Sequence, residues 1–235
     1  MDDLFTPPLS APLSAPLSGQ TLGRAPIQAL TGHAQALEDC DLSEADLSDL
    51  DLSGWSFTRC DLRHTRLVGA RLERTRWQSC RAAFADLRGA DLAEARFQSS
   101  DINNAVLRGA AITGASFTSC KLTGADLSDT KAMEASFEET LLINAKLPGF
   151  SFRKQVLRRV DFGQADLRKC DFRGAVLEGC SLRDAHVVGA RFEAADLRGA
   201  DLGGLRLIDA AAFRGAIISR DQAAQFLAEL GLKLA

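Results

Sequence analysis

The sequence lacks long apolar runs: no stretch of its 235 residues approaches the 18 consecutive apolar residues that a membrane-spanning helix needs. Its first residues, Met1-Asp2-Asp3-Leu4-Phe5, also lack the basic region and the apolar region that begin a secretory signal. We therefore expect a soluble cytoplasmic protein that does not interact with a membrane.

A basic excess is missing as well. The chain has 28 lysines and arginines against 31 acidic residues, which gives a net charge of −3. Proteins that bind nucleic acid usually carry a basic patch or stripe, so direct nucleic-acid binding is not expected. The acidity is concentrated at the start, because residues 1–60 hold nine acidic and two basic residues, whereas residues 61–160 carry a net charge of +5.

The residue types of common catalytic and metal sites are scarce or unsuitably spaced. The three histidines, His33, His64 and His186, are far apart, and no nucleophile or carboxylate recurs beside them. The six cysteines have no C-x-x-C spacing, and the glycine-rich patterns of nucleotide-binding loops are missing. We expect a protein that is not an enzyme, with no catalytic residue, no metal site and no cofactor.

A five-residue repeat dominates the chain. Every fifth residue from Leu37 to Leu207 gives 35 central positions without an insertion or deletion, of which 21 are Leu and eight are Phe. The residue two before the central one is Ala, Cys, Ser or Thr at 28 of the 35 positions. This small position holds all six cysteines: Cys40, Cys60, Cys80, Cys120, Cys170 and Cys180. We interpret them as small core residues that replace alanine.

A period of five fits neither a helix, which repeats every 3.6 residues, nor a strand, which repeats every two. It fits a square coil in which each five-residue word forms one side, so that four words close a 20-residue turn. The central residue and the small residue then both point inward. We predict an all-β solenoid, a right-handed quadrilateral parallel β-helix, about 40 Å long at the usual strand spacing. The competing interpretation, a leucine-rich helical protein, does not explain the regular Gly, Ser and Asp.

Aspartate often precedes the central residue, as in Ala45-Asp46-Leu47. We interpret these carboxylates as acceptors for the backbone of the neighbouring turn, as in Asx-turns, rather than as paired catalytic acids.

The two ends depart from the repeat. We predict that residues 1–34 form a disordered Pro/Ser-rich tail and cap, that residues 35–217 form the β-helix, and that residues 218–235 form a capping and dimerisation helix with a tail. Ser219 and Gln222 have the spacing of a capping box, and Gly231 is a plausible helix stop. The apolar face of the predicted helix consists of Ala223, Phe226, Leu227 and Leu230. This face either plugs the last coil or binds a second copy, and we favour the homodimer.

Several words break the size rule. Bulky or polar residues stand at the small position at Leu50, Trp55, Phe150, Gln155, Val160 and Leu205, and Ala82 and Ala132 underfill the central position. The stretch from Pro148 to Val160 suggests a local distortion of the coil. It is either a packing adjustment or a specialised face for a partner, because Arg153, Lys154, Arg158 and Arg159 crowd it.

With these words, residues 37–217 resemble the pentapeptide-repeat family. Two stretches are similar to the topoisomerase-protecting members of the Qnr, MfpA and AlbG type. Residues 79–90, Ser-Cys-Arg-Ala-Ala-Phe-Ala-Asp-Leu-Arg-Gly-Ala, are similar to a C-R-A-x-x-A-D-F-R-G-A segment, and residues 222–231 are similar to a terminal Q-A-x-x-x-x-x-x-L-G dimerisation helix. The unbroken repeat is closer to the loopless MfpA or AlbG type.

The resemblance implies a rod-shaped dimer that binds bacterial DNA gyrase, with topoisomerase IV as a second candidate, and shields it from poisons such as quinolones or albicidin-like compounds. It also implies that carboxylates imitate DNA phosphates. The contact candidates near the expected dimer centre are Asp161, Asp166, Asp171, Asp196 and Asp201. The basic stretch 61–160 does not suit a uniform DNA mimic. The alternative is a structural scaffold or an effector that binds another protein.

Overall fold

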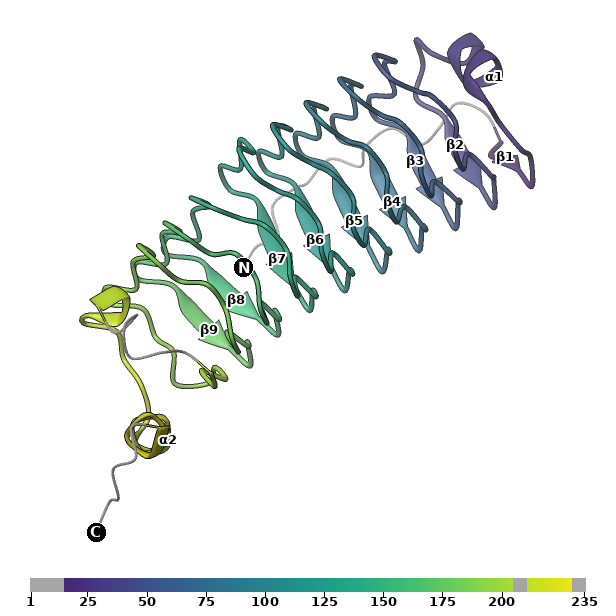
Figure 1. Cartoon of the computed structure of the whole chain (residues 1–235). Helices are drawn as coiled ribbons and strands as arrows, with labels where there is room; N and C mark the ends of the chain where they lie inside the picture. Colours follow the sequence, from purple (N-terminus) through teal and green to yellow (C-terminus); the bar gives the residue numbers. More distant parts are fainter. Residues whose placement is uncertain (1–14, 205–210, 230–235) are drawn as a thin grey trace, which may run out of the picture.

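The chain forms an elongated rod of stacked coils (Figure 1). This is a computed structural model, which describes residues 15–204 and 211–229. One short strand recurs in each of nine coils: β1 (Leu17–Ser18), β2 (Ala36–Glu38), β3 (Ser56–Thr58), β4 (Arg76–Gln78), β5 (Arg96–Gln98), β6 (Ser116–Thr118), β7 (Ser136–Glu138), β8 (Val156–Arg158) and β9 (Val176–Glu178). They pair in parallel and in sequence order, with partners 20 residues apart, as in Phe97 with Phe117.

Each coil has four sides, as the repeat predicts. The nine strands make one side, which we call face A. Faces B, C and D follow it along the chain, with central residues 42, 47 and 52 and their equivalents every 20 residues. Single bridge pairs join successive coils on these faces, such as Asp41 with Asp61 on face B and Asp46 with Arg66 on face C. The predicted fold class is confirmed.

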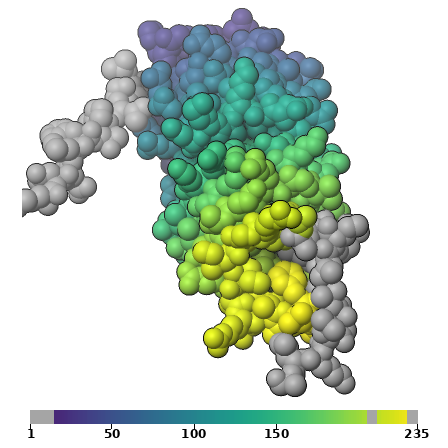
Figure 2. All heavy atoms as spheres, turned by 90° about the vertical axis from the view of Figure 1, so that its left-hand side faces the viewer, coloured from purple at the N-terminus to yellow at the C-terminus, as the bar shows by residue number. Residues whose placement is uncertain are grey.

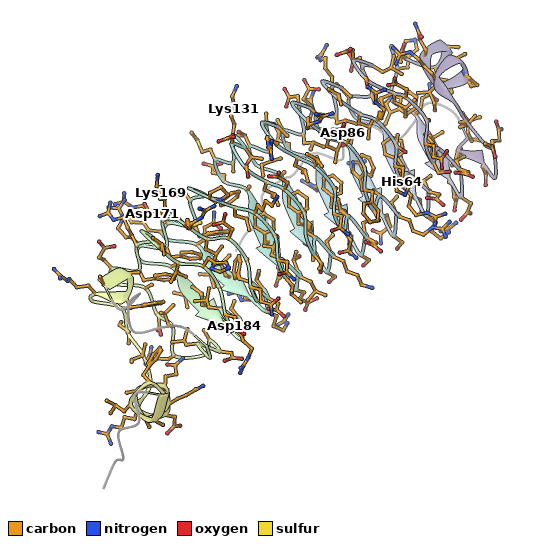
Figure 3. All side chains as sticks on the ribbon, in the orientation of Figure 1. His64, Asp86, Lys131, Lys169, Asp171 and Asp184 are labelled. Atoms are coloured by element: carbon orange, nitrogen blue, oxygen red, sulfur yellow. The ribbon has the colours of Figure 1, made fainter. Side chains whose placement is uncertain are left out.

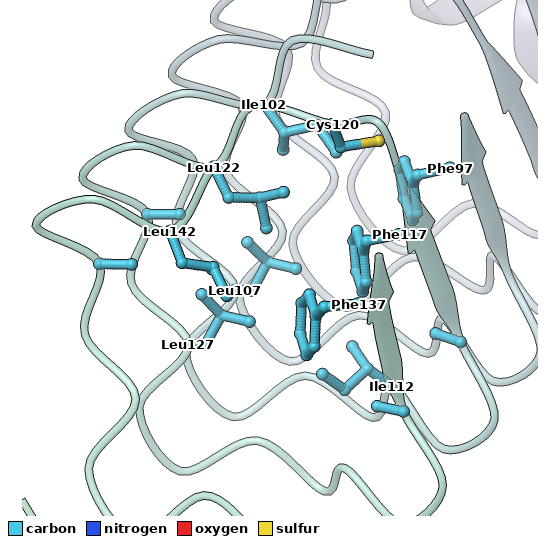
Figure 4. Close-up of a cluster of buried hydrophobic side chains, with 14 of the residues drawn as sticks. Phe97, Ile102, Leu107, Ile112, Phe117, Cys120, Leu122, Leu127, Phe137 and Leu142 are labelled. Carbon is cyan, nitrogen blue, oxygen red and sulfur yellow. The ribbon is translucent and has the colours of Figure 1, made fainter. Parts of the chain in front are cut away.

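The bore of the rod is filled by the central residues. Leu92, Leu107 and Leu122 are all fully buried, as the square-coil interpretation requires. Beneath face A the rings of Trp77, Phe97, Phe117 and Phe137 form a continuous stack with centroid distances of 5.1, 4.9 and 5.1 Å. Figure 4 shows three of these rings together with leucines of faces B and C. A second stack, from Phe152 through Phe172 and Phe192 to Phe213, lies beneath face D.

The second residue after each central residue turns the chain at a corner. Twenty-two non-glycine residues at this position have φ between 51° and 61°, in the left-handed region. That conformation costs an L-residue about 1–2 kcal/mol. The corner N–H donates to the next coil, as from Glu44 to the Arg63 carbonyl at 2.9 Å, and so helps to offset the cost. No β-branched residue occupies this position between residues 39 and 204, which agrees with the strain argument.

The first coil begins within the segment that the sequence assigned to the tail. Leu17 pairs with Leu37, and the Leu22 N–H donates to the Asp41 carbonyl at 2.8 Å. Helix α1 (Arg24–Ala29) takes the place of a side and seals the end of the bore with Ile27, which is fully buried. The boundary predicted at residue 34 is therefore corrected: the ladder starts at Leu17, and the cap is part of the first coil. Residues 1–14 lie outside the described residues.

At the other end, α2 (Arg220–Glu229) follows the last described coil, and Figure 2 shows the yellow residues before residue 230 at this end of the rod. The predicted capping box is confirmed, because the Gln222 N–H donates to Ser219 Oγ at 3.1 Å and the Ser219 N–H donates to Gln222 Oε1 at 2.7 Å. Gln222 Nε2 also donates to the carbonyls of Leu197 and Ala200, both at 2.7 Å. The Gln222 side chain thus caps the start of the helix and also binds two backbone carbonyls of the last described coil. Leu205, Leu207, Leu230 and Gly231 lie outside the described residues.

Candidate partner-binding surface

The cysteines lie in the packed core, and the histidines lie on the solvent-exposed surface. All six cysteines are buried at the small position. Burial raises the pKa of Cys120 to about 11 and that of Cys170 to about 12, which disfavours the thiolate. His33, His64 and His186 are exposed, and the His64 ring stacks on Phe84 at 5.1 Å. Within residues 15–204 and 211–229 no three His, Cys, Asp or Glu side chains gather as metal ligands would, and no described helix is long and apolar enough to cross a membrane.

The aspartates before the central positions hold the turns, as predicted. In all thirteen cases between residues 41 and 201, Oδ1 accepts the backbone N–H of the residue two further on, at 2.8–3.3 Å. The carboxylates are therefore fixed on the wall with one oxygen turned towards the backbone.

Arginine neutralises many of these aspartates. In five words the residue after the central position is Arg, and its guanidinium lies 2.6 Å from the aspartate of the same word: Arg63 with Asp61, Arg88 with Asp86, Arg168 with Asp166, Arg173 with Asp171 and Arg198 with Asp196. The hydrogen bond from Arg173 lowers the pKa of Asp171 to about 2, and Arg198 does the same for Asp196.

Charges also alternate along the rod. On face C Arg66 lies between Asp46 and Asp86 in successive coils, and on face D Arg71 lies between Asp51 and Asp91. Arg66 is 3.3 Å from Asp46, and Arg71 is 3.1 Å from Asp51. Opposite charges at directly paired positions stabilise neighbouring strands. Much of the surface charge therefore joins one coil to the next instead of forming an acidic column.

The Asp171 pair provides a pH test. The folded-state pKa of Asp171 lies below its unfolded value of about 3.9, so the pair stabilises the fold above that pH, and this stabilisation is lost as the pH falls through about 2. We expect Asp171→Asn to lower the free energy of unfolding by about 1 kcal/mol at pH 7, because this partly exposed pair is screened by solvent. Chemical denaturation between pH 7 and 2 should show this difference shrinking towards zero. The control is Asp184→Asn, because Asp184 is exposed and its carboxylate forms no ion pair within the described part, where the neighbouring Arg183 pairs with Asp201 instead. An equal loss in Asp184→Asn would contradict the assignment.

The five predicted contact residues do not gather on one face. Asp196 lies on face A, Asp161 and Asp201 on face B, Asp166 on face C and Asp171 on face D. Three of them are held by the arginine of their own word, and Asp201 is held by Arg183 at 2.9 Å. The proposed contacts thus surround the rod.

Face B nevertheless differs from the other faces in charge. Its outward positions between residues 41 and 204 carry seven acidic and four basic side chains, whereas faces A, C and D each carry equal numbers between residues 36 and 199. The acidic residues of face B are Asp41, Glu44, Asp61, Asp101, Asp161, Asp184 and Asp201. Figure 3 shows His64 and Asp184, both from corners of face B, on one long side of the rod, and Lys131, Lys169 and Asp171 on another.

Between residues 37 and 204 the ladder is interrupted once, at the stretch that the sequence predicts to be distorted. Lys131 and Ser151 of face D form no bridge, although Ala111 pairs with Lys131 and Ser151 pairs with Asp171. Strands β7 and β8 are paired only at Glu138 and Arg158. A cavity of about 960 Å³ lies here, within the size range of ligand pockets. We call it the seam cleft; its two rims are residues 127–137 and 148–156.

The size irregularities account for the seam. Ala132 underfills the central position of face D, while Phe150 occupies a small position in the next coil. The Phe150 ring lies 4.6 Å from Phe152 and 5.8 Å from Phe137, so three rings crowd one corner where the two aromatic stacks meet. Trp55 also stands at a small position, but there the next coil still pairs, since the Arg76 N–H donates to the Trp55 carbonyl at 2.9 Å. A bulky residue alone therefore does not open the ladder.

The helix face predicted to form the dimer interface is half-buried in the single chain. Phe226 packs against the core at the end of the rod, and Ala223 and Leu227 are also half-buried. Leu230, the fourth predicted interface residue, lies outside the described residues. The helix therefore contributes to capping through Phe226.

Comparison with known proteins agrees with the architecture. A family model described as "Pentapeptide repeat region" matches residues 33–107. Another, "Pentapeptide repeats (8 copies)", matches residues 90–129, 135–174 and 175–210 and thus omits residues 130–134, at the seam. No curated protein matches the chain.

Two solved structures of pentapeptide repeat proteins are similar to this chain at low identity. Full-length QnrB1, a plasmid-mediated fluoroquinolone resistance protein, is 20% identical with a TM-score of 0.41, over 92% of this chain and 97% of QnrB1. HetL, a pentapeptide repeat protein involved in heterocyst differentiation regulation from the cyanobacterium Nostoc sp. strain PCC 7120, is 24% identical with a TM-score of 0.38, over 81% and 89% of the two chains.

Proposed function

Because this chain belongs to the pentapeptide-repeat family, we propose that it works as a binding rod whose partner is bacterial DNA gyrase, with topoisomerase IV as a second target. In this proposal the rod occupies the DNA-binding surface of the enzyme and shields it from poisons such as quinolones or albicidin-like compounds. The observation that carries the proposal is the acidic excess of face B, because a surface that binds DNA is basic and attracts a rod with one acidic side.

The charge density of face B is much lower than that of DNA, so carboxylates that imitate phosphates cannot alone account for competition with DNA. Double-stranded DNA carries one charge per about 1.7 Å of its axis. Face B presents seven carboxylates over nine coils, which span roughly 40 Å at the usual strand spacing, and four basic side chains lie among them. We therefore propose that the rod competes with DNA mainly by its shape, and that the carboxylates of face B, including Asp161 and Asp201, orient it.

The proposal includes a homodimer through α2. Its support is the half-buried apolar face of Ala223, Phe226 and Leu227, together with the similarity of residues 222–231 to the terminal helix of topoisomerase-protecting relatives. A two-fold contact of this kind would join two rods end to end and lengthen the surface available to a partner.

The test combines gyrase supercoiling with drug-stabilised cleavage assays. Purified protein should inhibit supercoiling or reduce quinolone-stabilised cleavage when added in excess over the enzyme. If it does neither, the gyrase proposal is wrong, and a scaffold for another protein becomes the better interpretation.

A matched pair of variants tests the role of face B. Asp161→Asn with Asp201→Asn removes two charges from face B, while each asparagine oxygen can still accept the turn N–H. Asp166→Asn with Asp171→Asn does the same on faces C and D. We expect the first pair to raise the concentration for half-maximal inhibition at least about threefold and the second pair to change it less. Charges at the edge of an interface mainly speed association, and only the first pair lies on the proposed binding face. Equal effects would exclude face B as the binding face.

A further inference from the structure

The seam cleft exposes two strand edges that face each other. In intact coils of face D, the N–H groups of the central and corner residues donate to carbonyls of the next coil in the sequence, as from Ile112 to Lys131 and from Gly114 to Met133. At the seam the equivalent N–H groups of Ala132 and Glu134 have no backbone partner among the described residues, and neither does the N–H of Asp129.

The opposite rim carries the complementary groups. The carbonyls of Pro148, Ser151 and Arg153 are the acceptors that the regular ladder would supply to those three N–H groups, and the bonds are missing from residues 129–156. The Ser151 and Val156 N–H groups also lack their usual acceptors in the preceding coil. The side-chain Nε2 of Gln155 donates to the Ala135 carbonyl, the usual acceptor of Val156, at 3.1 Å. The two rims are thus the two edges that a parallel strand between them would satisfy.

We propose that the seam cleft is a peptide-binding site that receives an extended acidic and apolar segment as an added parallel strand, and that its ligand is residues 2–5 of this chain, Asp-Asp-Leu-Phe. Strand addition at an open edge draws affinity from main-chain hydrogen bonds and specificity from alternate side chains. This site is separate from the gyrase proposal, because the cleft lies on face D and the adjoining part of face A.

The side chains of the cleft suit such a segment. Consecutive side chains of a strand point to opposite faces, so Leu4 and Phe5 take one side each. Met133, which is 73% exposed, and Val156, which is 46% exposed, offer apolar contacts on the outer side, and Ala132 and Phe137 line the inner side. The rim at residues 148–156 carries Arg153 and Lys154 and no carboxylate, which suits Asp2 and Asp3. Neither Arg153 nor Lys154 lies within 4 Å of an acidic group in the described part of the chain. Asp129 and Glu134 on the other rim favour placing the acidic residues away from it.

The position of the segment in the chain allows it to reach the cleft. Each coil runs from face A through faces B and C to face D, so the residues before Leu17 lead away from the corner between faces D and A, the corner on which the cleft lies. Leu17 and Phe137 are six coils apart on face A, which is ~29 Å at the usual spacing. The twelve residues from Phe5 to Leu17 span up to ~40 Å when extended.

Hydrogen exchange of the full-length protein tests the proposal. We compare the wild type with Leu4→Ser/Phe5→Ser and with the matched control Leu9→Ser/Leu13→Ser, which makes the same changes outside the proposed ligand. The amides of Ala132, Glu134 and Ser151 should exchange at least about tenfold more slowly in the wild type and in the control than in Leu4→Ser/Phe5→Ser. Arg153→Glu should abolish this protection without lowering the stability of the rod.

A synthetic peptide of residues 1–6 provides the second measurement. Added to the Leu4→Ser/Phe5→Ser protein, it should restore the protection, and a peptide with Leu4 and Phe5 replaced by serine should not. Equal exchange in all proteins, or failure of the peptide to restore protection, would overturn the proposal. Protection that rises with protein concentration would also overturn it, because the segment would then bind a second copy and not its own cleft.

Discussion

Phe117→Ala is expected to lower the free energy of unfolding by about 3–5 kcal/mol. The ring is 1% exposed and lies between Phe97 and Phe137 within the aromatic stack beneath face A. Coils of a solenoid contact only their neighbours, so a cavity here weakens two coil interfaces at once and nothing distant can compensate. Urea or guanidinium denaturation followed by circular dichroism measures the loss. The effect should also appear as a second, earlier transition if the two halves of the rod begin to unfold separately.

The matched control is Phe84→Ala. Phe84 is 52% exposed at a corner and contacts the His64 ring on the surface. Its removal should change the free energy of unfolding by only about 0.5 kcal/mol or less, as is usual for surface substitutions. A loss at Phe117 no larger than the loss at Phe84 would contradict the role of the stacked rings as the core of the rod.

The repeat allowed the architecture to be predicted because its period is also the period of burial. A residue that recurs every five positions without a shift must occupy the same place on every side of the coil, so Leu92, the cysteines and the small residues could be placed inside without coordinates. The role of the aspartates followed for the same reason. The capping box at Ser219 was predictable because it is a local pattern of four residues.

The structure of the two ends and of the seam could not be predicted from the five-residue period. Leu17, Leu22 and Ile27 continue the phase of the central positions, but the prolines and small residues around them conceal it, and α1 replaces a regular side. The sequence predicts a distortion near Pro148, and it shows Ala132 separately as a small residue at a central position. That the two irregularities meet across one coil boundary depends on the 20-residue register, which brings residue 132 beneath residue 152.

The same register explains why the contact candidates spread around the rod. Residues five apart, such as Asp161, Asp166 and Asp171, lie on successive faces, whereas residues 20 or 40 apart share one. Asp161 and Asp201 satisfy that condition, and a search for charges at 20-residue spacing would have found face B. The arginines after the central residues carried a further signal, because the words Asp-Leu-Arg and Asp-Phe-Arg place a cation beside each carboxylate.

Leu227→Asp is expected to convert the proposed dimer into a monomer, so that the molar mass measured by light scattering falls from two chains to one. Both Leu227 and Phe226 lie on the predicted interface, but only Phe226 packs against the core at the end of the rod. A buried carboxylate without a partner is incompatible with an apolar two-fold contact, whereas in a monomer the Leu227 side chain can face water. The fold should therefore persist in Leu227→Asp.

Phe226→Asp separates the two roles of the helix. Because Phe226 also caps the rod, this substitution should both halve the mass and lower the free energy of unfolding by about 2 kcal/mol or more, while Leu227→Asp should only halve the mass. Sedimentation and denaturation of the two variants at the same protein concentration give the comparison. An unchanged mass in both variants would leave α2 as a cap alone, and a rod that binds gyrase would then do so as a single chain.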